Sequence, residues 1–334
     1  MIRKYMAYGI GAALVDTEIK VQDAELERMG VEKGLMTLVD ADRQAELLSH
    51  LGGHLVTATH ASGGSAGNSM IATALFGAPT FMSCKVADDE DGNIYLADLE
   101  AAGVTHCLTN GRESGVTGKC LVLISPDAER SMNTNLAISE TLSVDQLVPG
   151  AIAESEYLYV EGYLVTSPTG RAAAVRAREI AEAEGVKTSL SFSDPGMVQF
   201  FREGLEEMLG GGVDLVFCNE AEALGWGQCE DLDSAMEALK QVAKQFVITR
   251  GADGALTFDG QALAEIPPHK VLAVDSNGAG DMFAGAFLYA LSRGEDFATA
   301  GRFASLAAGR VVSQYGPRLP AAQYAALREE FFGN

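Results

Sequence analysis

The sequence contains few cysteines, and their arrangement suggests no structural role. There are five in 334 residues, and no two of them form a C-x-x-C pair. Disulfide frameworks are typical of short chains with an even number of cysteines, so disulfides are not expected here. We therefore expect reduced, buried thiols and a cytoplasmic protein.

Basic residues are scarce relative to acidic ones. Lysine and arginine together number 24 and aspartate and glutamate 46, which gives a formal net charge of −22. A surface this acidic repels the phosphates of nucleic acids and of anionic lipids. We therefore expect a small-molecule substrate, with neither nucleic acid nor a membrane as partner.

Long apolar runs are also missing. No stretch reaches the ~18 residues that are needed to span a bilayer. The apolar run that follows Arg3 and Lys4 ends at Asp16 without a clear cleavage site. It therefore predicts a first core strand and not a signal peptide.

Two short patterns that could indicate a metal site or a phosphate loop fail on their spacing. His50 and His54 are four residues apart, but Gly52 and Gly53 between them would break a helix. The segment Gly115–Cys120 has two residues between its glycines where a Walker A loop has four, and it ends in cysteine. We expect neither site.

Apolar residues make up 47% of the chain, which is enough for a large core. Strand-like and helix-like segments alternate, and this pattern predicts βαβ units with a mostly parallel sheet covered on both faces. The expected strands are 4–15, 54–59, 80–86, 157–164, 186–192, 213–219 and 244–250. The expected helices are 41–51, 65–76, 91–102, 168–184, 196–208, 279–293 and 296–313.

A predicted β-hairpin, 116–125 with 130–136, does not fit this alternation, and neither does the segment 17–22. We interpret these parts as a small β-sheet lid that projects from the main body. The sequence therefore predicts one α/β domain over 1–334, with a lid formed by segments about 16–60 and 105–136.

The most informative segment runs from Asp275 to Asp281 (DSNGAGD) and precedes a clear helix. Glycines let backbone amides approach a ligand closely, and amides at a helix N-terminus form an anion site. Asp281 lies among these amides, where a carboxylate can accept a hydroxyl proton during phosphoryl transfer. By itself the loop fits equally well with a plain glycine-rich turn in which Asp281 caps the helix.

Three further segments accompany this loop, in the order 62–68, 219–222 and 249–254. Together the four resemble the motifs of the ribokinase (PfkB) family: the double glycine with a later asparagine, N-x-x-E, T-x-G-x-x-G and D-[ST]-[TN]-G-A-G-D. The opening 9–16 and the asparagine at 277 resemble the adenosine-kinase-like branch. Ala12 departs from that branch, which usually carries asparagine there, and this puts adenosine specificity in doubt.

The resemblance implies a three-layer ribokinase-like α/β fold with a small β-sheet lid. It also implies an ATP-dependent kinase that phosphorylates a primary hydroxyl of an adenosine-like nucleoside or of a sugar. Sugar kinases of the ribokinase or fructokinase type and inosine or guanosine kinases remain alternatives. Mg²⁺ is implied as a cofactor, K⁺ is used by some members, and the protein would be a monomer or a homodimer.

The resemblance assigns roles to individual residues. Asp281 would be the general base, and the amides of Gly278, Ala279 and Gly280 would form the anion hole. The acceptor would be bound by Asp16, Gly63, Gly64 and Asn68. The nucleotide would be bordered by Asn219, Glu222, Thr249, Gly251 and Asn277, with Glu222 acting on Mg²⁺ through water. A monovalent cation would lie near Asp275, Val311, Gln314 and Gly316.

Two other functions are compatible with parts of the sequence. The segment 63–67 fits the G-x-S-x-G elbow of serine hydrolases, with Asp194 and His269 downstream in the order of a triad around Ser65. A non-catalytic nucleoside- or sugar-binding protein would keep the fold but lose the base.

Two side chains outside the motifs carry open alternatives. Arg130, on the predicted hairpin, could close over phosphates or be an exposed charge. Trp226 could stack on adenine or be an aromatic at the edge of the core.

Overall fold

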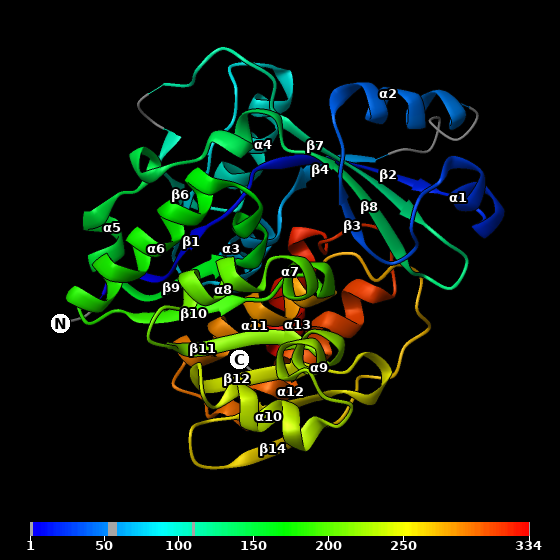
Figure 1. The fold of residues 1–334 in the computed structure, drawn as a ribbon. Coiled ribbons are helices and arrows are strands. Elements are labelled where there is room, and N and C mark those ends of the chain that lie inside the picture. The colour runs from blue at the N-terminus through cyan, green and yellow to red at the C-terminus, as the bar shows by residue number, and fades with distance from the viewer. Residues whose placement is uncertain (1–2, 53–58, 109–110, 334) are drawn as a thin grey trace.

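The computed structural model describes residues 3–52, 59–108 and 111–333, which form two sheets and their covering helices (Figure 1). The larger sheet has nine strands in the order β14-β13-β12-β11-β10-β9-β1-β5-β6, and β13 alone runs opposite to the other strands. The strands are, in that order, Leu263–Ile266, Ala255–Phe258, Ala243–Thr249, Val213–Asn219, Lys187–Ser191, Ser155–Glu161, Tyr5–Ile10, Thr80–Ser83 and Thr105–His106.

Helices cover both faces of this sheet, as the alternating pattern predicts. One layer consists of α3 (Ser65–Phe76), α11 (Ala279–Ser292), α12 (Phe297–Val312) and α13 (Ala321–Phe332). The other consists of α5 (Pro149–Ala153), α6 (Pro168–Ala183), α7 (Pro195–Phe200), α8 (Arg202–Leu209), α9 (Glu220–Gly227) and α10 (Leu232–Leu239). Short 3-10 helices lie at Ala137–Thr141, Val144–Gln146, Gly162–Thr166 and Gly251–Asp253.

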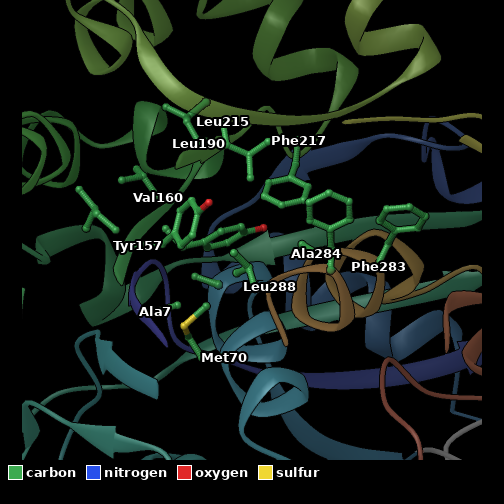
Figure 2. Packing of buried hydrophobic residues seen from close by; sticks show 14 of the residues in the cluster. Ala7, Met70, Tyr157, Val160, Leu190, Leu215, Phe217, Phe283, Ala284 and Leu288 are labelled. Atoms are coloured by element: carbon green, nitrogen blue, oxygen red, sulfur yellow. The ribbon is translucent and has the colours of Figure 1, made fainter. Parts of the chain in front are cut away.

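The core lies between the large sheet and its helices. Figure 2 shows Tyr157, Leu190 and Phe217 from neighbouring strands beside Phe283 and Leu288 of α11. Helix α11 is almost wholly apolar from Met282 to Ala290, and all of these residues are buried. A helix that is apolar all round belongs in a core, so α11 is fixed firmly against the sheet.

The smaller sheet has five strands in the order β3-β8-β7-β2-β4: Met36–Leu38, Arg130–Asn135, Gly118–Ile124, Leu14–Lys20 and Thr59–Gly63. It extends to one side of the main body together with α1 (Asp23–Met29) and α2 (Ala41–His50) (Figure 1). These two helices bury a second apolar cluster against the sheet, which includes Ile19, Leu26, Leu47 and Leu121. Helix α4 (Glu90–Ala101) packs between β4 and the edge strand β6.

The structure corrects several predicted boundaries. The single strand expected over 4–15 is two strands in different sheets, β1 and β2, because the chain crosses from one sheet to the other at 11–13. The helix expected over 196–208 is divided at Phe201 into α7 and α8. The strand expected at 54–59 lies outside the described residues except for Thr59, where β4 begins. Residues 105–106, at the start of the predicted lid segment 105–136, instead pair with β5 in the large sheet.

Other predictions are confirmed. Helix α3 has the predicted limits, and β7 pairs with β8 in the antiparallel hairpin that the sequence indicated. The sequence analysis did not predict α1, α13 or the strands β13 and β14. Among the described residues, no helix is long and apolar enough to cross a membrane.

Candidate active site

Three adjoining cavities lie at the edge of the large sheet where its parallel strands end, which is where α/β sheets commonly bind ligands. The first, of about 70 Å³, lies between the two sheets; the second and third, of about 480 and 570 Å³, extend along the ends of β11 and β12. Ser65, Arg130 and Asp281 line both the first and the second cavity. Ala279 and Gly280 line both the second and the third. The three cavities therefore meet around the loop 275–281.

The glycine loop begins α11 in the conformation that an anion site needs. Gly278 is the N-cap and has φ 72°, and a Cβ there would lie 2.2 Å from the carbonyl oxygen of Pro317. Only glycine fits both constraints. Among the described residues, the N–H groups of Gly278 and Gly280 donate to no protein acceptor, whereas the Ala279 N–H, which was also predicted to bind the anion, donates to the Ser276 carbonyl oxygen at 3.3 Å. Free donors at the start of a 14-residue helix favour a bound anion.

Asp281 lies in the first turn of α11, at the junction of the first and second cavities. Its Oδ1 accepts a hydrogen bond from Ser65 Oγ at 2.7 Å, and its Oδ2 accepts one from Asn68 Nδ2 at 3.0 Å. Burial raises the pKa of Asp281, while these two bonds and the nearby arginines oppose the increase. A desolvated carboxylate with a raised pKa is a suitable proton acceptor near neutral pH.

Asn68 was predicted to contact the acceptor directly, but its amide nitrogen is hydrogen-bonded to Asp281. Its Oδ1 is buried and has no hydrogen-bond partner among the described residues. An unpaired buried acceptor costs free energy, so this atom is available for a ligand hydroxyl.

Asp16 lies on β2 and faces the first cavity. Its side chain is buried, and no donor among the described residues bonds to it. Burial, followed by the nearby Glu18 carboxylate, raises the pKa of Asp16 to about 7, and Arg318 opposes the increase. Gly63 on β4 lies directly against it, since a Cβ there would be 2.1 Å from Asp16 Oδ1. The structure therefore brings together two of the four residues that the resemblance assigned to the acceptor.

Glu161, at the end of β9, is a site residue that the sequence analysis missed. It is fully buried beside the first cavity and accepts hydrogen bonds from Ala12 N at 2.6 Å and Ala66 N at 2.8 Å. Burial raises the pKa of Glu161 to about 7. Glu161 thereby links the crossover between the two sheets to the start of α3. The sequence signal for Glu161 was its position as a single acidic residue within the apolar segment 157–164.

Arg130, on β8, points into the site and is not an exposed hairpin charge. It lines the first and second cavities, and its Nη1 donates to Asn277 Oδ1 at 3.1 Å. Asn277 also donates from Nδ2 to Glu18 Oε1 at 3.0 Å. Asn277 therefore links the glycine loop to two strands of the smaller sheet, β8 and β2.

Asn219 and Glu222 form a reciprocal cap at the start of α9, on the wall of the second cavity. Burial, with a contribution from the Asp194 carboxylate, raises the pKa of Glu222 to about 7. A cation held through water would suit two such carboxylates. No cluster of three or more metal-binding side chains occurs in the described ranges. Thr249 and Gly251 border the second and third cavities.

The residues predicted to line a monovalent-cation site lie close together but are bonded to one another. The buried carboxylate of Asp275 accepts from Asn277 N at 2.8 Å and from Gly316 N at 3.0 Å. The Val311 carbonyl accepts from Gln314 N at 3.1 Å. A K⁺ requirement therefore stays a prediction, to be checked by assaying activity with K⁺ replaced by Na⁺ and by an organic cation.

Comparison with known proteins identifies the family of this chain. Residues 34–323 match the pfkB family of carbohydrate kinases. The chain belongs to this family. The protein is therefore a phosphotransferase that acts on an alcohol group.

Individual relatives indicate the branch. An adenosine kinase from Schizosaccharomyces pombe is 27% identical over 315 residues, which cover 87% of this chain and 89% of the relative. The crystal structure of an adenosine kinase from Sinorhizobium meliloti is 34% identical with a TM-score of 0.93, covering 98% of this chain and 99% of that one. A probable sugar kinase from Rhizobium etli CFN 42 is 32% identical with a TM-score of 0.91, covering 97% and 99%. The ribokinase-like fold and the adenosine-kinase-like branch are thus confirmed.

The serine-hydrolase alternative is wrong for a pfkB kinase, and the geometry explains why. The Ser65 hydroxyl donates to Asp281, and Asp194 is used as the N-cap of α7, where it accepts from Gly196 N. His269 lines the third cavity, whereas Ser65 lines the first two. No hydrogen bond joins the three residues in the described part of the chain.

Trp226 is a core residue. It is 3% exposed on α9 and packs against Phe192 at a ring separation of 5.0 Å. It borders none of the three cavities. Stacking on adenine is therefore excluded for this side chain.

Proposed function

We propose that the protein is an ATP-dependent nucleoside kinase that phosphorylates a primary hydroxyl of an adenosine-like substrate. Support comes from the two-sided lining of the first cavity. Its lining combines polar groups, among them Asp16, Asn68 and Asp281, with an apolar part made of Leu14, Met36, Cys120, Met132 and Leu136. A ribose suits the polar end because a carboxylate accepts two hydroxyl hydrogen bonds well, and a base suits the apolar part. A free sugar would leave the apolar part empty.

The single observation that carries the proposal is the position of Asp281 between the acceptor cavity and the free amides of the glycine loop. The acceptor hydroxyl gives its proton to the Asp281 carboxylate as its oxygen attacks the γ-phosphorus of ATP, and ADP leaves. The amides of Gly278 and Gly280 and the guanidinium of Arg130 stabilise the negative charge on the transferring group.

We place ATP in the second and third cavities, with its phosphates at the glycine loop and its base beyond Thr249 and Gly251. Mg²⁺ bound to ATP would supply charge neutralisation there. Asn219, Glu222 and Asp194 would hold that ion through water, and two buried carboxylates with raised pKa values support this placement.

We also propose that the smaller sheet acts as a lid over the acceptor. Its strands β2 and β8 supply Asp16 and Arg130, so the site is complete only when this sheet lies against the main body. Closure would exclude water that otherwise hydrolyses ATP.

The test is an ATP-consumption screen over nucleosides and sugars, followed by Asp281→Asn. We expect a purine nucleoside to be the best acceptor and the variant to lose about 10²–10⁴-fold in kcat, with ATP binding retained. Asp231→Asn is the matched control, because Asp231 is an exposed helix cap on α10.

Two outcomes would contradict the proposal. A loss below tenfold in Asp281→Asn would remove the general base. Turnover of free sugars alone would remove the nucleoside as acceptor.

A further inference from the structure

A short segment between α12 and α13, Gly316–Arg318, contacts both halves of the site. Gly316 N donates to Asp275 Oδ2 at 3.0 Å, at the start of the glycine loop. A Cβ added to Gly278 would lie only 2.2 Å from the Pro317 carbonyl oxygen. This segment therefore packs directly beneath the anion-binding amides.

The next side chain extends to the acceptor half. Arg318 Nη1 donates to Ser62 Oγ at 2.8 Å, and its Nη2 donates to Asp98 Oδ2 at 2.9 Å. Asp98, on α4, also accepts from Ser62 N at 3.0 Å and from Ser62 Oγ at 2.7 Å. The Arg318 side chain is only 14% exposed.

Ser62 adjoins the backbone that encloses the acceptor. It is buried on β4, immediately before Gly63, which lies against the Asp16 carboxylate. Gly64 follows with φ 89°, and a Cβ there would be 2.2 Å from the Ala12 carbonyl oxygen. A shift of Ser62 would therefore move the double glycine relative to Asp16.

We propose that Arg318 is a positioning residue that fixes the acceptor-binding turn relative to the anion loop, with Asp98 as its anchor. This inference rests on the proposed function but adds to it a residue that none of the sequence motifs includes. Charge-assisted bonds to a partly buried carboxylate are stronger than neutral ones, so the anchor is suited to hold a turn in place.

Arg318 also affects the charge of the acceptor site. The groups that face Asp16 are the carboxylates of Glu18 and Asp281, the guanidinium groups of Arg318 and Arg130, and the Cys120 thiol. Of the two cations, Arg318 has the larger effect in lowering the pKa of Asp16. Without it, Asp16 takes up a proton at a higher pH and accepts fewer hydroxyl hydrogen bonds near neutrality.

The experiment compares Arg318→Gln with Arg318→Lys and with the matched control Arg310→Gln. Arg310 forms an ion pair with Glu330 between α12 and α13 and lines none of the three cavities, and its variant makes the same change in charge. We measure thermal unfolding first, then kcat and KM for the best acceptor and for ATP between pH 5.5 and 9.

For Arg318→Gln we expect the acceptor KM to rise about tenfold or more, in line with loss of hydrogen bonds to a charged group, and the KM for ATP to change less than twofold. The acidic limb of kcat/KM for the acceptor should move to higher pH. Arg318→Lys should return the acidic limb to its original pH, because lysine restores the positive charge. Arg310→Gln should behave like the unchanged protein.

For Arg318→Gln, the inference is overturned if the acidic limb stays in place, or if the KM values for acceptor and ATP rise together. Should Arg318→Gln fail to fold, Asp98→Asn removes the anchor and keeps the charge of Arg318. In that variant the acceptor KM should rise while the KM for ATP stays the same, and an unchanged acceptor KM would overturn the inference. If Arg318→Gln has the kinetics of the unchanged protein while Asp281→Asn is inactive, this inference is refuted and the proposed function remains intact.

Discussion

At the scale of single residues, the site is dominated by buried carboxyl groups. Burial is the largest cause of the raised pKa in Asp16, Glu161, Glu222 and Asp281. A carboxyl whose pKa is raised on folding stabilises the protein fully below its unfolded value of about 4, and this contribution is lost as the pH rises through the folded value. For Asp16 and Glu161 the loss falls between about pH 4 and about pH 7. The free protein therefore carries a cost at neutral pH that ligand hydroxyls can offset.

Asp16→Asn tests this cost. At pH 8 we expect the free energy of unfolding to rise by roughly 1–3 kcal/mol, because the variant removes a buried charge without a hydrogen-bond partner. At pH 5 the gain should nearly vanish, because Asp16 is then already protonated. Denaturant unfolding at both pH values measures it, and the KM for the acceptor should rise.

The control is Asp42→Asn, which removes an exposed carboxylate of α2 and should leave the KM for the acceptor unchanged. An equal gain for Asp16→Asn at pH 5 and pH 8 would show that the effect is not the titration of Asp16.

At the scale of elements, the site depends on how α3 and α11 pack together. A Cβ at Gly285 of α11 would lie 2.7 Å from the Ala72 Cβ and from the Ser69 carbonyl oxygen of α3. This close approach, at helix faces made of small residues, brings the first turn of α3 against the first turn of α11. Ser65 and Asn68 thereby reach Asp281.

Gly278→Ala tests the start of α11. The left-handed φ of Gly278 costs other residues roughly 1–2 kcal/mol, and the contact with Pro317 adds to this. We expect a loss of about 2 kcal/mol or more in stability and a fall of more than tenfold in kcat/KM. Unfolding curves and steady-state assays measure these changes.

Gly280→Ala is the paired variant. Gly280 has no positive φ, and a Cβ there would meet nothing within 4 Å. Its stability should stay within about 0.5 kcal/mol of the unchanged protein or rise slightly, because alanine favours helices. Equal destabilisation of the two variants would contradict the role assigned to the Gly278 conformation.

At the scale of the whole molecule, the smaller sheet has one face toward the main body and the other under helices. Helices α1 and α2 cover its outer face, and Leu47 and Leu51 are fully buried there. A dimer formed through the faces of two such sheets would need this surface to be free.

We therefore expect a monomer, with or without substrates. Sedimentation velocity at micromolar concentrations, repeated over a tenfold range, should give one species of unchanged mass. A dimer whose population grows with concentration would contradict this expectation.

The sequence predicted the glycine loop, the double glycine and Asp281 because their requirements are local. A left-handed glycine, a helix N-terminus and a carboxylate in its first turn are all encoded within a few consecutive residues. The alternation of strands and helices similarly predicted a parallel sheet covered on both faces, since each segment has its own periodicity.

Contacts between distant segments were decided only by the tertiary structure. Glu161 binds Ala12, 149 residues away, and Arg318 binds Ser62, 256 residues away. Tertiary packing also decides that 4–15 divides into strands of two sheets. It decides as well that the Asn68 side chain is directed toward Asp281. Neither spacing nor composition encodes which buried polar group meets which partner. That pairing is settled when the two sheets and their helices pack and most buried donors and acceptors find a partner.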